Sequence, residues 1–414
     1  MKRRADRPGR VELRRILTVT VLVSALGYFV DVYDLLLFSI VRVESLRELG
    51  VADEDMLSTG VLLLNWQMIG LLLGGIAWGI LGDKRGRVSV LFGSIALYSV
   101  ANIANAFVTN VPTYAALRFL AGLGLAGELG AAVTLITETL PKETRGYGTA
   151  IVASFGLLGA VVAALVGGLT NWRIAFAIGG VLGLTLLGLR FKLRESGMFH
   201  TARSGDATRG SLRHLLGTPA RRWRYLHCIL LGMPVWFAIG VLITFSPEFG
   251  RELGITGAIS AGTAVLVTYA GGVAGDLASG FASQRFKSRQ WVMLIFIAGI
   301  ALAMDAILIP RGYSASTFYV LCAILGFFVG YWAVFVTQAA EQFGTNLRAT
   351  VATTVPNLIR GSVVPLTLVT TALRGPLGLG RAALLVGAAC CLIALWSLRS
   401  LKETYGADLD YVEA

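Results

Sequence analysis

Residues 61–87 read VLLLNWQMIGLLLGGIAWGILGDKRGR, an apolar run that is followed at once by a cluster of basic residues. About 20 consecutive apolar residues are enough to cross the hydrocarbon core of a bilayer as a helix. Charged residues are excluded from the run and gather where it ends. This stretch therefore predicts a transmembrane helix that leads into a basic loop at the membrane surface.

The same alternation of apolar run and charged loop continues along the whole chain, which has 414 residues and is 55% hydrophobic. It predicts an all-α polytopic membrane protein with twelve transmembrane helices and no room for an appended soluble domain. The predicted spans are 16–39, 57–81, 88–108, 112–137, 147–169, 172–189, 225–245, 257–282, 290–310, 314–338, 349–372 and 376–398.

The basic residues predict the orientation of these spans. Of the 36 Lys and Arg residues, 27 fall on the side of the N-terminus, seven on the opposite side, and two, Arg118 and Arg360, inside spans. Because cytoplasmic loops carry the excess of Lys and Arg, we expect both termini to be cytoplasmic and the location to be the plasma (bacterial inner) membrane. The net charge of +12 is then a signal of topology and not of nucleic-acid binding.

The loop from 190 to 224 is long, basic and predicted to be cytoplasmic, and it divides the spans into six and six. The predicted divisions are a cytoplasmic tail (1–15), an N-terminal six-helix bundle (16–189), a cytoplasmic linker (190–224), a C-terminal six-helix bundle (225–398) and a cytoplasmic tail (399–414).

Matching loops of the two halves resemble each other. The loop 79–87 corresponds in order to GFASQRFKS at 280–288, although Gln284 replaces the acid. Two further loops each carry a glutamate and an arginine seven residues apart. These pairs are Glu138 with Arg145 and Glu341 with Arg348. Two such matches at the same ordinal positions predict a duplicated six-helix unit with pseudo-symmetry.

Nothing in the sequence predicts enzyme chemistry. The four cysteines all lie in predicted spans, and the three histidines lie in or beside the central loop without metal-ligand spacing. A phosphate-binding loop and a nucleophile elbow are also missing from the sequence. We therefore expect no cofactor, no metal and no ATP-driven pump.

Ionisable residues inside spans are costly unless they are paired or face water, so they mark candidate functional positions. Asp31 and Asp34 lie three residues apart in the first span, and the fourth span holds Arg118 and Glu128. At ~1.5 Å per residue, Asp34 and Arg118 both lie roughly 8–9 Å below the outer surface. They can meet if spans one and four are adjacent, whereas Glu128 lies about 15 Å lower.

Two of these segments resemble motifs of the major facilitator superfamily. GILGDKRGR at 79–87 is similar to the loop 2–3 signature G-x-L-x-D-R-x-G-R, and RFLAGLG from Arg118 is similar to the span-4 motif R-x-x-x-G-x-G. The resemblance implies two six-helix bundles around a midplane cavity that opens alternately to each side. It also implies a cytoplasmic latch between the halves. The candidate latch residues are Gly79, Asp83, Lys84, Arg85, Gly86, Arg87, Glu138, Arg145, Glu341 and Arg348.

Within that superfamily, Tyr33-Asp34 followed by VESL at 43–46 resembles the first span of the proton-coupled sugar symporters. The resemblance implies that Asp34 and Arg118 form the proton-coupling pair; a static ion pair that fixes two helices is the alternative. Two departures matter. The seventh span lacks the paired glutamines that hold a sugar, and the fifth lacks the G-P-x-x-G-G of the drug/proton antiporters.

Further residues are candidates for substrate binding. Arg360 either pairs with an acid such as Asp31 or Glu128 or meets an anionic substrate, for which its fork geometry is suited. Polar residues in spans are alternatively hydrogen bonds between helices, and tryptophans are alternatively packing. The substrate-binding candidates are Asp31, Glu128, Arg360, Asn65, Gln67, Trp236, Trp332 and Asn357.

These features together predict a secondary active transporter that takes up a small polar metabolite, an organic anion or a sugar by proton symport and alternating access. The alternatives are a proton-independent facilitator or exchanger of the same solutes, and a membrane receptor that binds solute without moving it. The expected partners are the small-molecule substrate, protons and the lipid bilayer, with no nucleic acid, and we expect a monomer.

Overall fold

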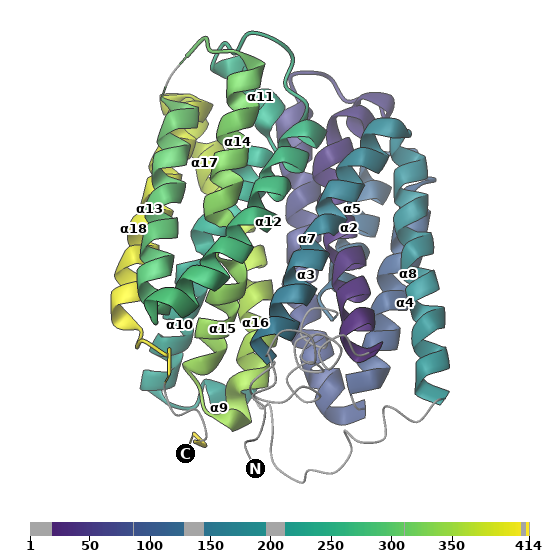
Figure 1. Ribbon diagram of the computed structural model, residues 1–414. Coiled ribbons are helices and arrows are strands. Elements are labelled where there is room, and N and C mark those ends of the chain that lie inside the picture. Colours follow the sequence, from purple (N-terminus) through teal and green to yellow (C-terminus); the bar gives the residue numbers. More distant parts are fainter. Residues whose placement is uncertain are drawn as a thin grey trace, which may run out of the picture.

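The structure is a computed structural model that describes residues 19–85, 87–127, 145–195, 212–309, 311–406 and 411–413. Regular structure within these ranges is helical, apart from one isolated β-bridge between Thr256 and Ser314. The helices lie side by side in one bundle, with their axes roughly along the same direction (Figure 1).

The helices before the central loop are α2 (Val19–Glu48), α3 (Met56–Arg85), α4 (Arg87–Asn105), α5 (Val111–Leu125), α7 (Arg145–Leu169) and α8 (Trp172–Glu195). Those after it are α9 (Leu212–Leu215), α10 (Pro219–Phe237), the π-helix η2 (Ala238–Ile243), α11 (Ser246–Glu252), α12 (Ala261–Phe286), α13 (Arg289–Leu308), α14 (Ala315–Val329), α15 (Trp332–Glu341), α16 (Thr345–Gly361), α17 (Val363–Leu377) and α18 (Leu379–Ser400).

Each predicted span overlaps one described helix or a consecutive series of them, and nine segments among the described residues are long and apolar enough to cross a membrane. Three predicted spans are interrupted. The seventh is divided between α10 and η2, the tenth between α14 and α15, and the eleventh between α16 and α17. Interruptions of this kind are tolerated at membrane depth where other groups satisfy the backbone.

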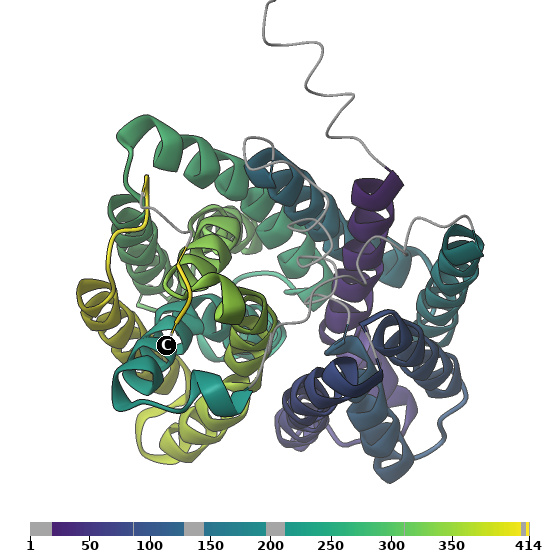
Figure 2. The ribbon, with the colours of Figure 1, turned by 90° about the horizontal axis from the view of Figure 1, so that it is seen from below.

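The helices pack into two groups that follow the order of the sequence. In the first, α2 packs on α7 and α8, α3 on α5, and α4 on both α5 and α8. In the second, α12 packs on α14, and α18 on α10, α13 and α17. The groups meet mainly where α12 lies against α7 and α16 against α3, and a view along the bundle shows them side by side (Figure 2).

Glycines bring helix backbones into direct contact within each group. A methyl group added at Gly122 of α5 would overlap the Gln67 carbonyl of α3, and one added at Gly275 of α12 would overlap the Phe327 carbonyl of α14. Lipid provides little hydrophobic drive for helix association, so close backbone packing stabilises such contacts instead. These glycines therefore stabilise the packing of the helices within each of the two groups.

Gly122→Ala should lower the thermal midpoint of the purified protein, because the new methyl forces α3 and α5 apart at a cost of about 1–3 kcal/mol. Gly188→Ala in α8 is the matched control. A methyl there meets no atom within 4 Å, so it should leave the midpoint unchanged or raise it slightly. Equal effects of both substitutions would contradict the packing interpretation.

Candidate functional site

A buried ion pair joins the two packing groups near the middle of the bundle. Nη2 of Arg360, in α16, lies 3.4 Å from Oδ2 of Asp31, in α2, and both side chains are buried. The other two guanidinium nitrogens of Arg360, Nε and Nη1, have no hydrogen-bond partner among the described residues. Arg360 therefore uses one of its donor atoms on Asp31 and keeps the rest available.

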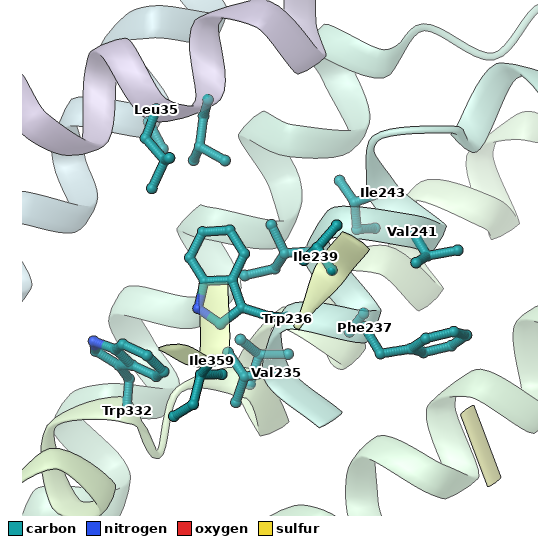
Figure 3. Close-up of a cluster of buried hydrophobic side chains, with 14 of the residues drawn as sticks. Leu35, Val235, Trp236, Phe237, Ile239, Val241, Ile243, Trp332 and Ile359 are labelled. Carbon is teal, nitrogen blue, oxygen red and sulfur yellow. The ribbon is translucent and has the colours of Figure 1, made fainter. Parts of the chain in front are cut away.

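Arg360 lines a cavity between the two groups. Four aromatic side chains share the lining, namely Tyr28, Trp236, Tyr269 and Trp332, and most of the remaining lining residues are aliphatic. The Arg360 guanidinium lies 5.6 Å from the ring centre of Trp236. Figure 3 shows Trp236 and Trp332 on the side of the C-terminal helices that faces Leu35 of α2, another lining residue. The site is thus an aromatic chamber with one guanidinium.

Asp34 and Arg118 occupy a separate place, inside the first packing group. Both are fully buried and interact electrostatically, yet no hydrogen bond or ion pair joins their side chains. The Arg118 guanidinium lies 5.3 Å from the ring centre of Phe38 and 5.2 Å from that of Phe176. The Asp34 carboxylate lies against Gly179 of α8. The first-span acids thus separate, with Asp31 toward the interface and Asp34 toward its own group.

The polar candidates outside the cavity make hydrogen bonds between helices. Asn65 accepts a 2.8 Å bond from Thr367, Gln67 donates to the Leu35 carbonyl at 3.3 Å, and Asn357 donates to the Ala126 carbonyl at 3.0 Å. None of the three lines the cavity. Their geometry favours the helix-packing alternative over substrate contact.

The break between α14 and α15 lies beside the cavity and is held by α12. The Ala333 N–H, in the first turn of α15, donates to Oδ1 of buried Asp276 at 3.0 Å. Oγ of Ser279 donates to the Gly330 carbonyl at 2.7 Å. Asp276 is not among the predicted site residues, although the criterion that selects Asp31, an acid inside an apolar run, applies to it equally. Asp276 thereby fixes the start of the helix that carries Trp332.

A second ion pair joins the groups at the end of the bundle where α2 finishes. Nη2 of Arg42 lies 2.7 Å from Oε2 of Glu248 in α11, and the guanidinium lies 4.7 Å from the ring centre of Phe245. Beside it, the hydroxyls of Ser39 and Thr244 are 2.9 Å apart. The predicted first span ends at residue 39, which leaves Arg42 in a loop. The apolar run stops there, but α2 continues to Glu48, so Arg42 is a buried helix residue.

At the other end of the bundle, Glu341 forms an ion pair with Arg289. Glu341 and Arg348, predicted as a pair, interact electrostatically, and Arg348 also donates to the Phe343 carbonyl at 3.4 Å. These contacts lie within the second packing group.

Glu403 follows α18 and contacts the start of α13. Burial disfavours its ionised form, but hydrogen bonds from the Ser288 hydroxyl and from the backbone N–H groups of Tyr405, Gln290 and Arg289 outweigh it and lower the pKa of Glu403. A lowered pKa means that this stabilisation is present above the ordinary glutamate pKa and is lost as the pH falls through the lowered value.

Several predicted residues lie outside what the structure describes. Gly86, Glu128 and Glu138 are not among the described residues. Gly79 lies in α3, and nothing is described of its surroundings. Five charged latch candidates lie in α3, α4 and α7, where the backbone is described but their side chains are not. These are Asp83, Lys84, Arg85, Arg87 and Arg145.

A family model described as the Major Facilitator Superfamily matches residues 17–362. A niacin transporter of Acinetobacter baylyi is 29% identical over 68% of this chain and 71% of its own. A gentisate transporter of Corynebacterium glutamicum is 26% identical over 91% of this chain and 86% of its own. These relatives are transporters and not enzymes.

Among solved structures, the proton:xylose symporter XylE bound to 6-bromo-6-deoxy-D-glucose matches with a TM-score of 0.71 and 18% identity. The match covers 96% of this chain and 98% of the other. At this identity the likeness concerns the fold: two groups of helices around a central cavity.

The contact between Ser39 and Thr244 can be tested by cross-linking. In the Ser39→Cys/Thr244→Cys double variant, mild oxidation should form a disulfide, because both side chains already lie at hydrogen-bond distance. Adding Glu248→Gln should reduce the yield, since it removes the neighbouring ion pair. Each single-cysteine variant serves as a control, and a yield unaffected by Glu248→Gln would contradict the stated role of the Arg42 pair.

Proposed function

Because the chain belongs to the Major Facilitator Superfamily, we propose that it is a secondary active transporter that takes up a small aromatic carboxylate together with protons. Transport proceeds by alternating access of the central cavity. The observation that carries this proposal is a single guanidinium with unused donor atoms inside an aromatic chamber.

The lining of the cavity favours an aromatic acid over a sugar. Arginine binds a carboxylate through two parallel hydrogen bonds, and Arg360 has unpaired nitrogens for this purpose. Tyr28, Trp236, Tyr269 and Trp332 supply ring surfaces against which a flat ring can pack. A sugar would need partners for each of its hydroxyls, and burying a hydroxyl without one costs about 1–3 kcal/mol. The cavity offers few such partners.

The relatives support the same class of substrate. Two of the relatives are named as transporters of niacin and of gentisate, and both compounds are aromatic acids. A 4-hydroxybenzoate transporter of Pseudomonas aeruginosa is 34% identical, over 34% of this chain. The sugar named by the XylE structure carries less weight, since that chain is only 18% identical.

The Asp31–Arg360 contact supplies a link between substrate and proton. When an incoming carboxylate forms an ion pair with Arg360, Asp31 loses its contact with the guanidinium. A buried carboxylate without its cation is more stable in the protonated form. Binding of the anion therefore favours uptake of a proton at Asp31, and the two charges cross the membrane together.

Asp34 and Arg118 remain the proposed coupling pair. Their burial and mutual electrostatic interaction support it, as does the lack of a hydrogen bond between their two side chains. Protonation of Asp34 weakens its attraction to Arg118, which then moves relative to the Phe38 and Phe176 rings. Movement of α5 against α2 would pass the change to the interface.

The excess of basic residues on the side of the N-terminus supports the proposal that the Arg42–Glu248 end is extracellular. That pair would then close the outer entrance, and the two packing groups would be the domains 16–189 and 225–398 that move against each other. The proposed inner latch would close the opposite entrance in turn. Its charged members include Asp83, Glu138, Arg145, Glu341 and Arg348.

Arg360→Gln should reduce uptake of an aromatic acid such as nicotinate into proteoliposomes by about tenfold to a hundredfold, the range expected for losing a hydrogen-bonded charge. Arg360→Lys keeps the charge but loses the fork and should restore uptake only in part. Arg374→Gln, in α17 and outside the cavity lining, is the control. Uptake of sugars in preference to aromatic acids by the unaltered protein would overturn the proposal.

Asp34→Asn should abolish accumulation driven by an inward proton gradient while exchange of labelled for unlabelled substrate continues, because the variant removes the titratable group but not the binding site. Accumulation and exchange are measured in the same proteoliposomes. Undiminished accumulation would exclude Asp34 from coupling. Equilibration without accumulation in the unaltered protein would indicate the facilitator alternative, and binding without flux the receptor.

A further inference from the structure

The cavity contains a second polar atom that the proposed function does not use. Thr268 of α12 lines the cavity and is 1% exposed, and its hydroxyl oxygen has no hydrogen-bond partner among the described residues. Among the side chains of the lining, only Thr268 and Arg360 have fully buried polar atoms left unpaired. Both therefore have hydrogen-bonding capacity that no described protein group takes up.

Among the described residues, Thr268 is the one threonine whose fully buried hydroxyl makes no hydrogen bond. A threonine in a membrane helix usually satisfies its hydroxyl by donating to the carbonyl four residues earlier. Five threonines here do so at 2.7–2.8 Å, namely Thr170, Thr185, Thr337, Thr354 and Thr370. Thr268 is in the interior of α12 and has the same opportunity, yet makes no such bond. Its hydroxyl is therefore available to a ligand in the cavity that Thr268 lines.

The position of Thr268 is also fixed. Gly326 of α14 lies against the Thr268 carbonyl, so closely that a methyl group there would overlap it. The backbone at residue 268 is held between α12 and α14 and cannot withdraw from the cavity without separating these helices. An unpaired hydroxyl in a buried, rigid position is costly by itself, and a ligand that pairs with it recovers that cost.

We infer that Thr268 is a specificity-determining residue that binds a second polar group on the substrate ring. This rests on the proposed function, in which Arg360 holds the carboxylate. The preferred ligand is then a planar ring acid that carries a hydrogen-bonding substituent away from the carboxylate, such as a ring hydroxyl or a ring nitrogen. A ring acid without such a group leaves Thr268 unpaired and binds more weakly.

The full-length protein in detergent can test this with benzoate and its three monohydroxylated derivatives as probes, using calorimetric titration of each. The unaltered protein should bind one hydroxybenzoate isomer roughly fivefold to tenfold more tightly than benzoate. Thr268→Val replaces the hydroxyl with a methyl of similar size. It should remove this preference while changing the affinity for benzoate by less than about twofold.

Two variants control for structural damage. Thr268→Ser retains the hydroxyl and should keep the preference. Thr370→Val removes a buried helical hydroxyl that is bonded to its own helix and lies outside the cavity lining, and it should change neither affinity. Equal weakening of benzoate and hydroxybenzoate by Thr268→Val would overturn the inference, as would no change with either. Failure of the unaltered protein to bind any of the four acids would instead overturn the proposed function itself.

Discussion

A guanidinium buried between two groups of helices must be neutralised, and the rest of this structure is arranged around that requirement. Arg360 contacts Asp31 across the interface through only one of its nitrogens. A charged side chain at this depth is expensive unless it pairs or meets a ligand. In the proposed mechanism the contact serves two purposes: it holds the groups together when the cavity is empty, and it is exchanged for a contact with an anion.

In the same proposal, the surroundings of Arg360 make this exchange selective for a ring acid. The aromatic side chains provide surface for a ring, and the interruptions of the helices lie close by. The break between α14 and α15 places Trp332 beside the cavity, and Asp276 pairs with the backbone that the break leaves open. The π-helix η2 contributes Ile239 to the same lining, and short π-helical segments often occur at functional sites. Local backbone irregularity is concentrated where a substrate would bind.

Much of this arrangement follows from the sequence. Apolar run length predicts the helices, and the cost of a buried charge selects Asp31, Asp34, Arg118 and Arg360 without any structure. Sequence also proposes an acid such as Asp31 or Glu128, or an anionic substrate, as the partner of Arg360. The spacing of three residues places Asp31 and Asp34 on neighbouring faces of the helix, but it does not show which of the two acids meets the other group.

What the sequence does not predict depends on helix ends and side-chain direction. The pairing of Arg42 with Glu248 is hidden because α2 extends beyond its apolar run. The role of Asn65 as a helix-to-helix hydrogen bond, rather than a substrate contact, depends on how α3 is rotated against α17. Thr268 looks like any other threonine in an apolar run, and only the burial of its unpaired hydroxyl in the structure distinguishes it.

The central claim, that a substrate anion displaces Asp31 from Arg360, is tested most directly by counting protons on binding. Titrating the purified protein with nicotinate in buffers of different ionisation enthalpy gives the number of protons exchanged. We expect uptake of up to about one proton per anion bound, reduced to near zero in Asp31→Asn. Binding without proton uptake, or uptake that persists unchanged in Asp31→Asn, would contradict it.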